Sequence, residues 1–326
     1  MENKTKLRLL YLYQHLLQHT DSKHPLSTPQ IIDILDKEYG IEVNRNTLAN
    51  DFKMLDSVGI RFKVIRSQQN KYYYDGRTFS LAELKILIDA ISSSRFIPEQ
   101  KSQELIEKVL SLTTGHQASK LRRHVHVEGR AKSENENGYK ILDKINEAID
   151  IGCKVKFQYA DYGPKKRKVL RHGGDYYIVS PYALVWDGDY YYVIGYSEMR
   201  EKVQNFRLDR IYREPRLLES ELQIPAPKDF NLAEYSRQVF RMFGTDEAVE
   251  VELLCKNYIM NAVIDQFGTK IRVQEVDKEH FKIRPVVCAS PTFYSWVFGW
   301  GGDMKILGPE KVTEEYKARA RKALED

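Results

Sequence analysis

Hydrophobic residues near the start of the chain recur at helical spacing, which predicts three helices. The apolar positions of the first are Leu7, Leu10, Tyr11 and Leu17. A second helix is expected to begin after Ser27, whose hydroxyl can cap it, and to end at Gly40. The third begins after Asn44, another capping residue, and turns Leu48, Phe52 and Leu55 inward.

A period of two replaces the helical period after the third helix. Phe62, Val64 and Ile65 are followed by the polar turn 67–70 and by the strand-like residues 71–74, which is a hairpin pattern. Helix, helix, turn, helix and hairpin is the order of a winged helix-turn-helix. We therefore expect this fold over residues 1–77.

Residues 78–150 are expected to form a helical connector. Ser80 and Glu83 make a capping box before an apolar stripe, and Pro98 restarts a second helix. The polar stretch 113–138 is expected to be irregular, with a short strand at 124–127. Another amphipathic helix is expected at 141–149.

Alternating strand-forming residues begin after Gly152 and predict a small SH3-like β-barrel over residues 151–218. Asp187 and Gly188 indicate a tight hairpin turn within it, because this pair tolerates the positive φ of such turns. Residues 219–244 form a linker, and residues 245–326 alternate strand and helix patterns as a βαββα-type domain. The predicted fold class is therefore α+β multidomain.

Composition narrows the class of protein further. The chain has 326 residues, 42% of them hydrophobic, which is enough for several cores. No apolar run is long enough to span a bilayer, so we expect a cytoplasmic protein. The three cysteines form no CxxC pair, so neither a disulfide framework nor a cysteine zinc site is expected.

Positive charge is concentrated in two regions. Residues 1–77 carry 12 Lys and Arg against 9 Asp and Glu, and residues 150–216 carry 13 against 9. Residues 217–326 reverse the balance, with 15 against 18. Contacts with polyanions therefore belong to the first two regions.

The third helix has the residue types of a DNA-recognition helix. Its packing positions leave Arg45, Asn46, Asn50 and Lys53 outward, and Arg and Asn pair bidentately with guanine and adenine. Phosphate contacts are expected from Thr28, which can use its hydroxyl or its backbone N–H, and from the hairpin. The predicted DNA-binding residues are Thr28, Arg45, Asn46, Thr47, Asn50, Lys53, Arg66 and Lys71.

Three motifs resemble those of bacterial transcriptional regulators that carry a WYL domain. The stretch 47–55 resembles their recognition helix, although Asn50 stands where many relatives have arginine. Residues 180–184, 191–196 and 206–211 resemble the WYL domain, with the name-giving Trp-Tyr-Leu present as Tyr191-Tyr192-Val193. The acidic C-terminal region resembles the extension that follows this domain.

This resemblance implies a homodimeric regulator that binds double-stranded operator DNA and senses an effector, in several members single-stranded DNA. Arginines beside an aromatic residue suit such an effector, because they combine phosphate forks with a stacking surface. Strand alternation puts Tyr191 and Val193 on one face and Tyr192 on the other. Two readings stay open: only Tyr192 faces the ligand while Tyr191 packs in the core, or both tyrosines only pack the barrel. The predicted ligand-binding residues are Ser180, Tyr182, Tyr192, Arg207, Arg210, Arg167 and Arg171.

No catalytic constellation is found, and we expect no cofactor, no metal site and no enzymatic activity. His124 and His126 lack a third ligand nearby, and no GxSxG nucleophile motif occurs. Two alternatives remain: a single-stranded nucleic-acid-binding accessory protein without operator specificity, and a nucleotide-processing enzyme. The latter needs an acidic metal cluster that the sequence does not suggest.

Overall fold

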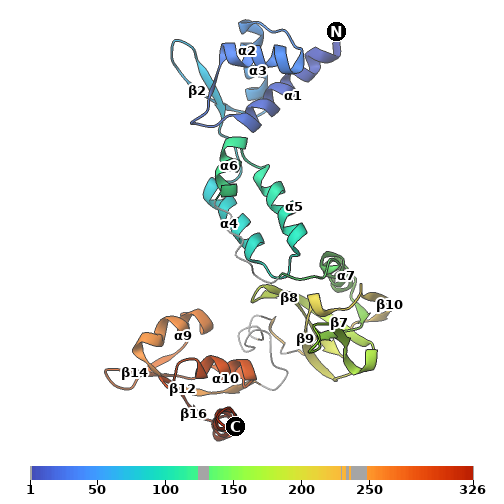
Figure 1. The fold of residues 1–326 in the computed structure, drawn as a ribbon, viewed down its shortest axis with the longest axis vertical. Coiled ribbons are helices and arrows are strands. Elements are labelled where there is room, and N and C mark those ends of the chain that lie inside the picture. Colours follow the sequence, from blue (N-terminus) through green and yellow to red (C-terminus); the bar gives the residue numbers. More distant parts are fainter. Residues whose placement is uncertain (1, 124–131, 229, 233–234, 236–247, 326) are drawn as a thin grey trace. The chain divides into compact units, whose positions relative to one another are not determined.

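The computed structural model of the chain describes residues 2–123, 132–228, 230–232, 235 and 248–325 (Figure 1). The chain divides into two compact units, Met1–Glu134 and Asn135–Asp326. Both mix helices with antiparallel sheets. None of the helices described is long and apolar enough to cross a membrane.

Three helices and a small sheet form the N-terminal part of the first unit. The helices are α1 (Glu2–His19), α2 (Thr28–Tyr39) and α3 (Arg45–Ser57). The strands β1 (Leu26–Ser27), β2 (Phe62–Ile65) and β3 (Lys71–Tyr74) pair in the order β1-β3-β2. These elements confirm the helices and the hairpin predicted from the sequence.

Their core differs from the prediction in one helix. Leu12 and Leu16 of α1 are buried, whereas Leu10 is 61% exposed and Leu7 is also exposed. The apolar residues of α1 spread over much of its circumference. The sequence pattern therefore does not single out the face that carries Leu12 and Leu16. The other core residues are Ile31, Leu35, Leu48 and Leu55.

Capping interactions set where α2 and α3 begin. The Ser27 backbone N–H and hydroxyl both donate to Gln30 Oε1 at 2.8 Å. Asn44 Oδ1 accepts a 2.8 Å hydrogen bond from the Thr47 N–H. Such caps satisfy backbone donors that a helix N-terminus leaves unpaired. The N-terminal turn of α3 is therefore firmly defined.

A buried ion pair joins α1 to α3. Arg8 Nε donates to Asp51 Oδ2 at 2.6 Å, and Arg8 Nη2 donates to Asp51 Oδ1 at 2.8 Å. The Asp51 side chain is only 1% exposed. Bidentate Arg–carboxylate pairs impose a defined geometry, so this pair fixes the rotation of α3 about its axis.

Three further helices complete the first unit: α4 (Leu81–Ser93), α5 (Glu99–Leu110) and α6 (Gly115–Arg123). The predicted capping box is present, with the Ser80 N–H donating to Glu83 Oε2 at 2.7 Å. The prediction of an irregular stretch at 113–138 was wrong for α6, because Ala118 and Leu121 pack into the core of α4 and α5. The strand expected at 124–127 lies outside the described residues.

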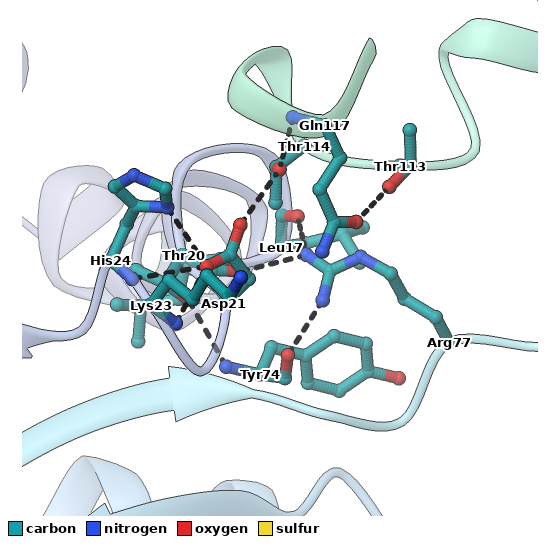
Figure 2. A network of polar contacts seen from close by, with 11 residues as sticks. Leu17, Thr20, Asp21, Lys23, His24, Tyr74, Arg77, Thr113, Thr114 and Gln117 are labelled. Carbon is teal, nitrogen blue, oxygen red and sulfur yellow. Dashed lines mark hydrogen bonds and ion pairs between the residues drawn. The ribbon is translucent and has the colours of Figure 1, made fainter. Parts of the chain in front are cut away.

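A polar network connects the N-terminal part to α6 (Figure 2). Asp21 Oδ2 accepts a 3.3 Å hydrogen bond from the Thr114 hydroxyl, and both residues are buried. Arg77 donates to the carbonyl oxygens of Thr20 at 2.9 Å and Tyr74 at 2.6 Å. We call these residues the joint. They tie α1, β3 and the start of α6 together.

The second unit begins with α7 (Gly138–Ile151), which packs on a five-stranded antiparallel sheet. The sheet order is β10-β4-β7-β8-β9, with β10 (Arg216–Leu222), β4 (Cys153–Phe157), β7 (Tyr177–Asp187), β8 (Tyr190–Ser197) and β9 (Lys202–Arg207). A separate hairpin is formed by β5 (Ala160–Tyr162) and β6 (Lys168–Leu170). In the described residues the sheet edges β9 and β10 are not paired with each other.

The predicted tight turn between β7 and β8 is present, but its two central residues are Gly188 and Asp189, one position later than the expected pair Asp187–Gly188. Gly188 has φ 50° and Asp189 has φ 76°, and Asp187 pairs with Tyr190. Two central residues with positive φ define a type I′ turn, which matches the twist of the strands. This turn sets the register of the β7–β8 hairpin as far as Ala183, beyond which the register shifts.

The four-stranded sheet of the C-terminal part contains one strand more than the sequence predicts, and β11 and β15 form a separate pair. Its sheet has the order β13-β14-β12-β16, covered by α9, α10 and α11. The expected βαββα pattern lacks β16, whose buried Met304 and Ile306 alternate with exposed residues. With β16 the order is that of a ferredoxin-like split βαβ fold. The elements are β11 (Ala248–Glu250), β12 (Glu252–Lys256), α9 (Met260–Phe267), β13 (Val273–Glu275), β14 (His280–Ile283), β15 (Val286–Cys288), α10 (Pro291–Phe298), β16 (Met304–Gly308) and α11 (Glu310–Lys322).

Candidate functional site

The outward face of α3 is polar and accessible. Arg45, Asn46, Asn50 and Lys53 are all exposed. Thr47 is half-buried, and its hydroxyl donates to Asn44 Oδ1 at 3.0 Å, which holds it at the cap. The structure therefore brings the four long side chains together on one helix face, while Thr47 contributes to its N-terminal geometry.

The hairpin β2–β3 presents a basic edge beside α2. Arg61, Lys63, Arg66 and Lys71 are exposed. The Thr28 N–H donates to the carbonyl of Asn70 at 3.3 Å, so α2 starts next to the hairpin turn. This bond corrects one expectation, because the Thr28 N–H is engaged and only its hydroxyl is left for a phosphate.

In the second unit, Arg207 is held in place on several sides. Its Nε donates to Asp209 Oδ1 at 3.0 Å and its Nη2 to Asp209 Oδ2 at 2.7 Å. The guanidinium carbon lies 3.4 Å from the centroid of the Tyr190 ring. Burial lowers the pKa of Arg207, but the hydrogen bonds and charge of Asp209 outweigh it and raise the pKa above its ordinary value. Arg207 is thus a fixed cation, stacked on an aromatic ring.

Two further predicted arginines meet at one carboxylate. Asp161 Oδ2 accepts from Arg171 Nε, and Asp161 Oδ1 accepts from Arg210 Nη1 at 3.1 Å. The Arg171 guanidinium also lies over the Tyr159 ring, 5.1 Å from its centroid. Tyr159 Oη accepts a 2.9 Å hydrogen bond from the Arg207 N–H, so this buried tyrosine connects the neighbourhoods of Arg171 and Arg207.

Arg167 lies in a tight turn between β5 and β6. The Gly163 N–H donates to the Arg167 carbonyl at 2.9 Å, and Lys166 has a positive φ of 57°. The turn exposes four consecutive basic residues, Lys165, Lys166, Arg167 and Lys168. Because β5 also carries Asp161, this positive charge belongs to the same hairpin as the shared carboxylate.

Ser180 and Tyr182 bind the chain segment that follows β10. Ser180 Oγ accepts a 2.9 Å hydrogen bond from the Ile224 N–H, and Tyr182 Oη donates to the Pro225 carbonyl at 3.2 Å. Ser180 is fully buried. Both predicted ligand-binding hydroxyls are therefore occupied by the protein's own backbone.

Tyr192 lies in a hydrophobic cluster. It is 8% exposed and packs with Ile194, Phe230 and Tyr235. Tyr235 Oη also donates to Asn205 Oδ1 at 2.8 Å, which anchors the covering segment to β9. Tyr191, on the other face, is half-buried against Trp186. Strand alternation separates the two tyrosines, but the expectation that Tyr192 faces a ligand and Tyr191 is core is not met, because residues after β10 cover Tyr192 and leave Tyr191 the more exposed of the two.

Three residues around the arginines were not singled out from the sequence: Tyr159, Asp161 and Tyr190. Tyr159 follows the alternation of β4, which is a weak signal for a buried aromatic residue. Asp161 and Tyr190 gain their roles through contacts across 49 and 17 residues, respectively. No pattern within one segment indicates such contacts.

Within the described ranges, no group of three or more His, Cys, Asp or Glu residues is arranged to hold a metal ion. His124 and His126 lie outside these ranges.

Comparisons with known proteins identify two domains in the second unit. A WYL domain matches residues 140–216, and a WCX domain matches residues 247–324. No curated protein matches the chain.

Two solved structures are similar to the chain. Proteasome accessory factor B/C (PafBC) of Arthrobacter aurescens is 18% identical over 97% of this chain, with a TM-score of 0.31. The chain spans 47% of that protein's length. A CRISPR Cas-related protein is 14% identical over 95% of this chain and 96% of its own, with a TM-score of 0.39.

Proposed function

We propose that this chain, which contains a WYL domain and a WCX domain, is a ligand-responsive transcriptional regulator that binds DNA. The proposal has no enzymatic step and places the protein in the cytoplasm. The proposed parts are a winged helix-turn-helix (1–77), a helical connector (78–150), an SH3-like WYL sensor (151–218), a linker (219–244) and a dimerising C-terminal extension (245–326). The structure modifies two of these bounds, because α7 packs on the WYL sheet and β10 extends that sheet to Leu222.

One observation carries the DNA-binding part: the exposed polar face of α3 lies in the same small fold as a basic hairpin. Arg45, Asn46 and Asn50 can reach base edges, and Lys53 can meet a phosphate. Arg66 and Lys71 provide backbone contacts that favour any sequence. Arg8 and Asp51 support this assignment, because they fix the orientation of α3.

A homodimer would bind a palindromic operator. Two recognition helices related by a two-fold axis meet the same face of the duplex when half-sites lie one helical turn, or a multiple of it, apart. The regulatory step requires an effector that binds one arrangement of the DNA-binding heads better than another.

The effector is proposed to be single-stranded DNA or a nucleotide-like anion. Arg167, Arg171, Arg207 and Arg210 supply positive charge, and half-buried Tyr190 supplies aromatic surface beside Arg207. Cations close to aromatic rings favour ligands that combine phosphates with bases.

Selection of duplexes from a random pool by the full chain tests the proposal. The expected result is an enriched palindrome whose binding changes when an effector oligonucleotide is added. Binding of all duplexes alike, with no enriched sequence, would overturn the regulator in favour of a non-specific nucleic-acid-binding protein.

A further inference from the structure

Asp161 stands at a position where two arginines converge. It accepts hydrogen bonds from Arg171 and from Arg210, and the three side chains are 40%, 43% and 37% exposed, respectively. The trio carries a net positive charge and is open to solvent. It can therefore exchange partners with an anion from solution.

The neighbouring arginine differs in this respect. Arg207 is paired bidentately with Asp209, lies on the Tyr190 ring and is only 21% exposed. Breaking that pair would leave the Asp209 carboxylate, whose side chain is only 13% exposed, without its arginine partner. Exchange is therefore easier at Asp161 than at Asp209, since exposed ion pairs are weak.

A carboxylate that spans two guanidinium groups presents its oxygens as a phosphate does. The four basic residues 165–168 lie on the same hairpin as Asp161 and raise the local concentration of anions. We propose that Asp161 is an internal competitor for the effector: a phosphate group takes its place between Arg171 and Arg210. This inference rests on the proposed nucleic-acid or nucleotide effector and names the subsite that receives its phosphate.

The competitor sets a threshold for effector binding. While Asp161 is bonded to Arg171 and Arg210, an anion must displace its carboxylate. The anion is also repelled by the negative charge of Asp161. Replacing Asp161 by Asn keeps an oxygen acceptor and removes the charge. We expect Asp161→Asn to bind the effector roughly 1.5- to fivefold more tightly, the range typical of one exposed charge interaction.

The test uses the full chain and fluorescence anisotropy of a labelled, 5′-phosphorylated strand of five thymidines at two salt concentrations. Glu219→Gln is the matched control, because it removes the same charge from exposed β10 at an edge of the sheet. The double variant Asp161→Asn, Arg210→Ala tests whether the increase in affinity for the strand depends on Arg210. Arg66→Ala tests whether the basic hairpin β2–β3 contributes to strand binding. Asp161→Ala provides a second neutral variant, and melting curves verify that each variant is folded.

Tighter, salt-sensitive binding by both Asp161 variants that disappears with Arg210→Ala and persists with Arg66→Ala supports the inference. Equal affinities of Asp161→Asn and Glu219→Gln overturn it, and the sensor proposal stands if the native chain binds through Arg207. If no variant binds the strand, the nucleic-acid effector is overturned together with its competitor.

Discussion

The ring of His24 stacks on the ring of His116, with 4.0 Å between centroids and 11° between planes. His24 belongs to the loop after α1, and His116 lies in the first turn of α6. The contact therefore links the N-terminal part of the first unit to α6, beside the joint of Asp21, Arg77 and Thr114 (Figure 2). A movement of α6 would be transmitted to α1 through these contacts.

Thr114→Val tests this link. The Thr114 hydroxyl donates to buried Asp21 and accepts from the Gln117 N–H, so its loss leaves two polar groups short of a partner. Such a loss costs about 1–3 kcal/mol. Hydrogen exchange should show reduced protection in α1 and α6 together. Thr113→Val, which removes a hydroxyl bonded to Gln117, is the control, and an equal loss in α1 there would refute the link.

Arg45→Ala and Arg66→Ala should have different effects on operator binding. Arg45 lies on the recognition face, so its loss should cost about 1–3 kcal/mol on the preferred sequence and relax discrimination at one base pair. Arg66 lies on the hairpin, so its loss should weaken binding evenly and reduce the salt dependence. Anisotropy titrations on the operator and on single-base variants measure both. Identical profiles for the two variants would remove the base-reading role of Arg45.

Asp51→Ala should strongly destabilise the N-terminal part of the first unit. The change leaves the mostly buried Arg8 guanidinium without its bidentate partner, which typically costs about 3–5 kcal/mol. Hydrogen exchange of the amides in α3 reports the loss. Asp56→Ala serves as the matched control in the same helix, because the Asp56–Arg61 pair is exposed and its loss should change little. Comparable losses in both variants would show that burial of the pair is not the cause.

Acid should weaken the first unit through His15. Burial lowers the pKa of His15 below its ordinary 6.5, and His19 lowers it further, against an opposing effect of Glu38. Because the folded state then binds protons less readily than the unfolded state, the stability from neutral His15 is complete above pH 6.5 and is lost as the pH falls through the folded pKa. Melting of the first unit between pH 7.5 and 5 measures the slope. His15→Gln should flatten it, whereas His280→Gln, in the second unit, should not.

Gly195→Ala should disrupt the sheet of the second unit. A Cβ atom at Gly195 would lie 2.4 Å from the Ser180 carbonyl oxygen and 2.8 Å from Val179 Cγ1. The β7–β8 register shifts between Pro181 and Ala183, which brings the strands close at this point. Overpacking of this kind costs about 1–3 kcal/mol. Thermal melting compares it with Gly299→Ala, whose Cβ would meet only ordinary contacts at 3.4 Å and should be tolerated.

Local signals in the sequence predict much of the fold. Asn44, the Ser80–Glu83 box and the Asp187–Gly188 turn each satisfy backbone groups within a few residues, so they can be identified without tertiary information. The helix α6 escapes prediction because only Ala118 and Leu121 mark its buried face. The strand β16 escapes because Met304 and Ile306 follow a glycine-rich turn and give a short alternation.

The candidate site is predictable in its residue types but not in its pairing. Arg207, Arg210 and Arg171 can be named from the sequence. The sequence does not show that Asp161 pairs with Arg171 and Arg210, because the three residues lie in separate segments of the chain. The burial of Tyr192 depends on Phe230 and Tyr235, which follow it by 38 and 43 residues. Contacts over such distances arise from the folded topology, which local spacing does not encode.

Three hydrogen bonds hold the segment after β10 on the sheet: Ile224 to Ser180, Pro225 to Tyr182 and Tyr235 to Asn205. These bonds shorten the covalent tether that leads to the WCX domain. The 13 residues from Gln223 to Tyr235 would span up to roughly 45 Å if released and extended. The effective concentration of one domain at the other falls as a tether lengthens beyond the span that it must bridge. A ligand that displaced the three anchors would thus loosen the two domains from each other even without touching the WCX domain.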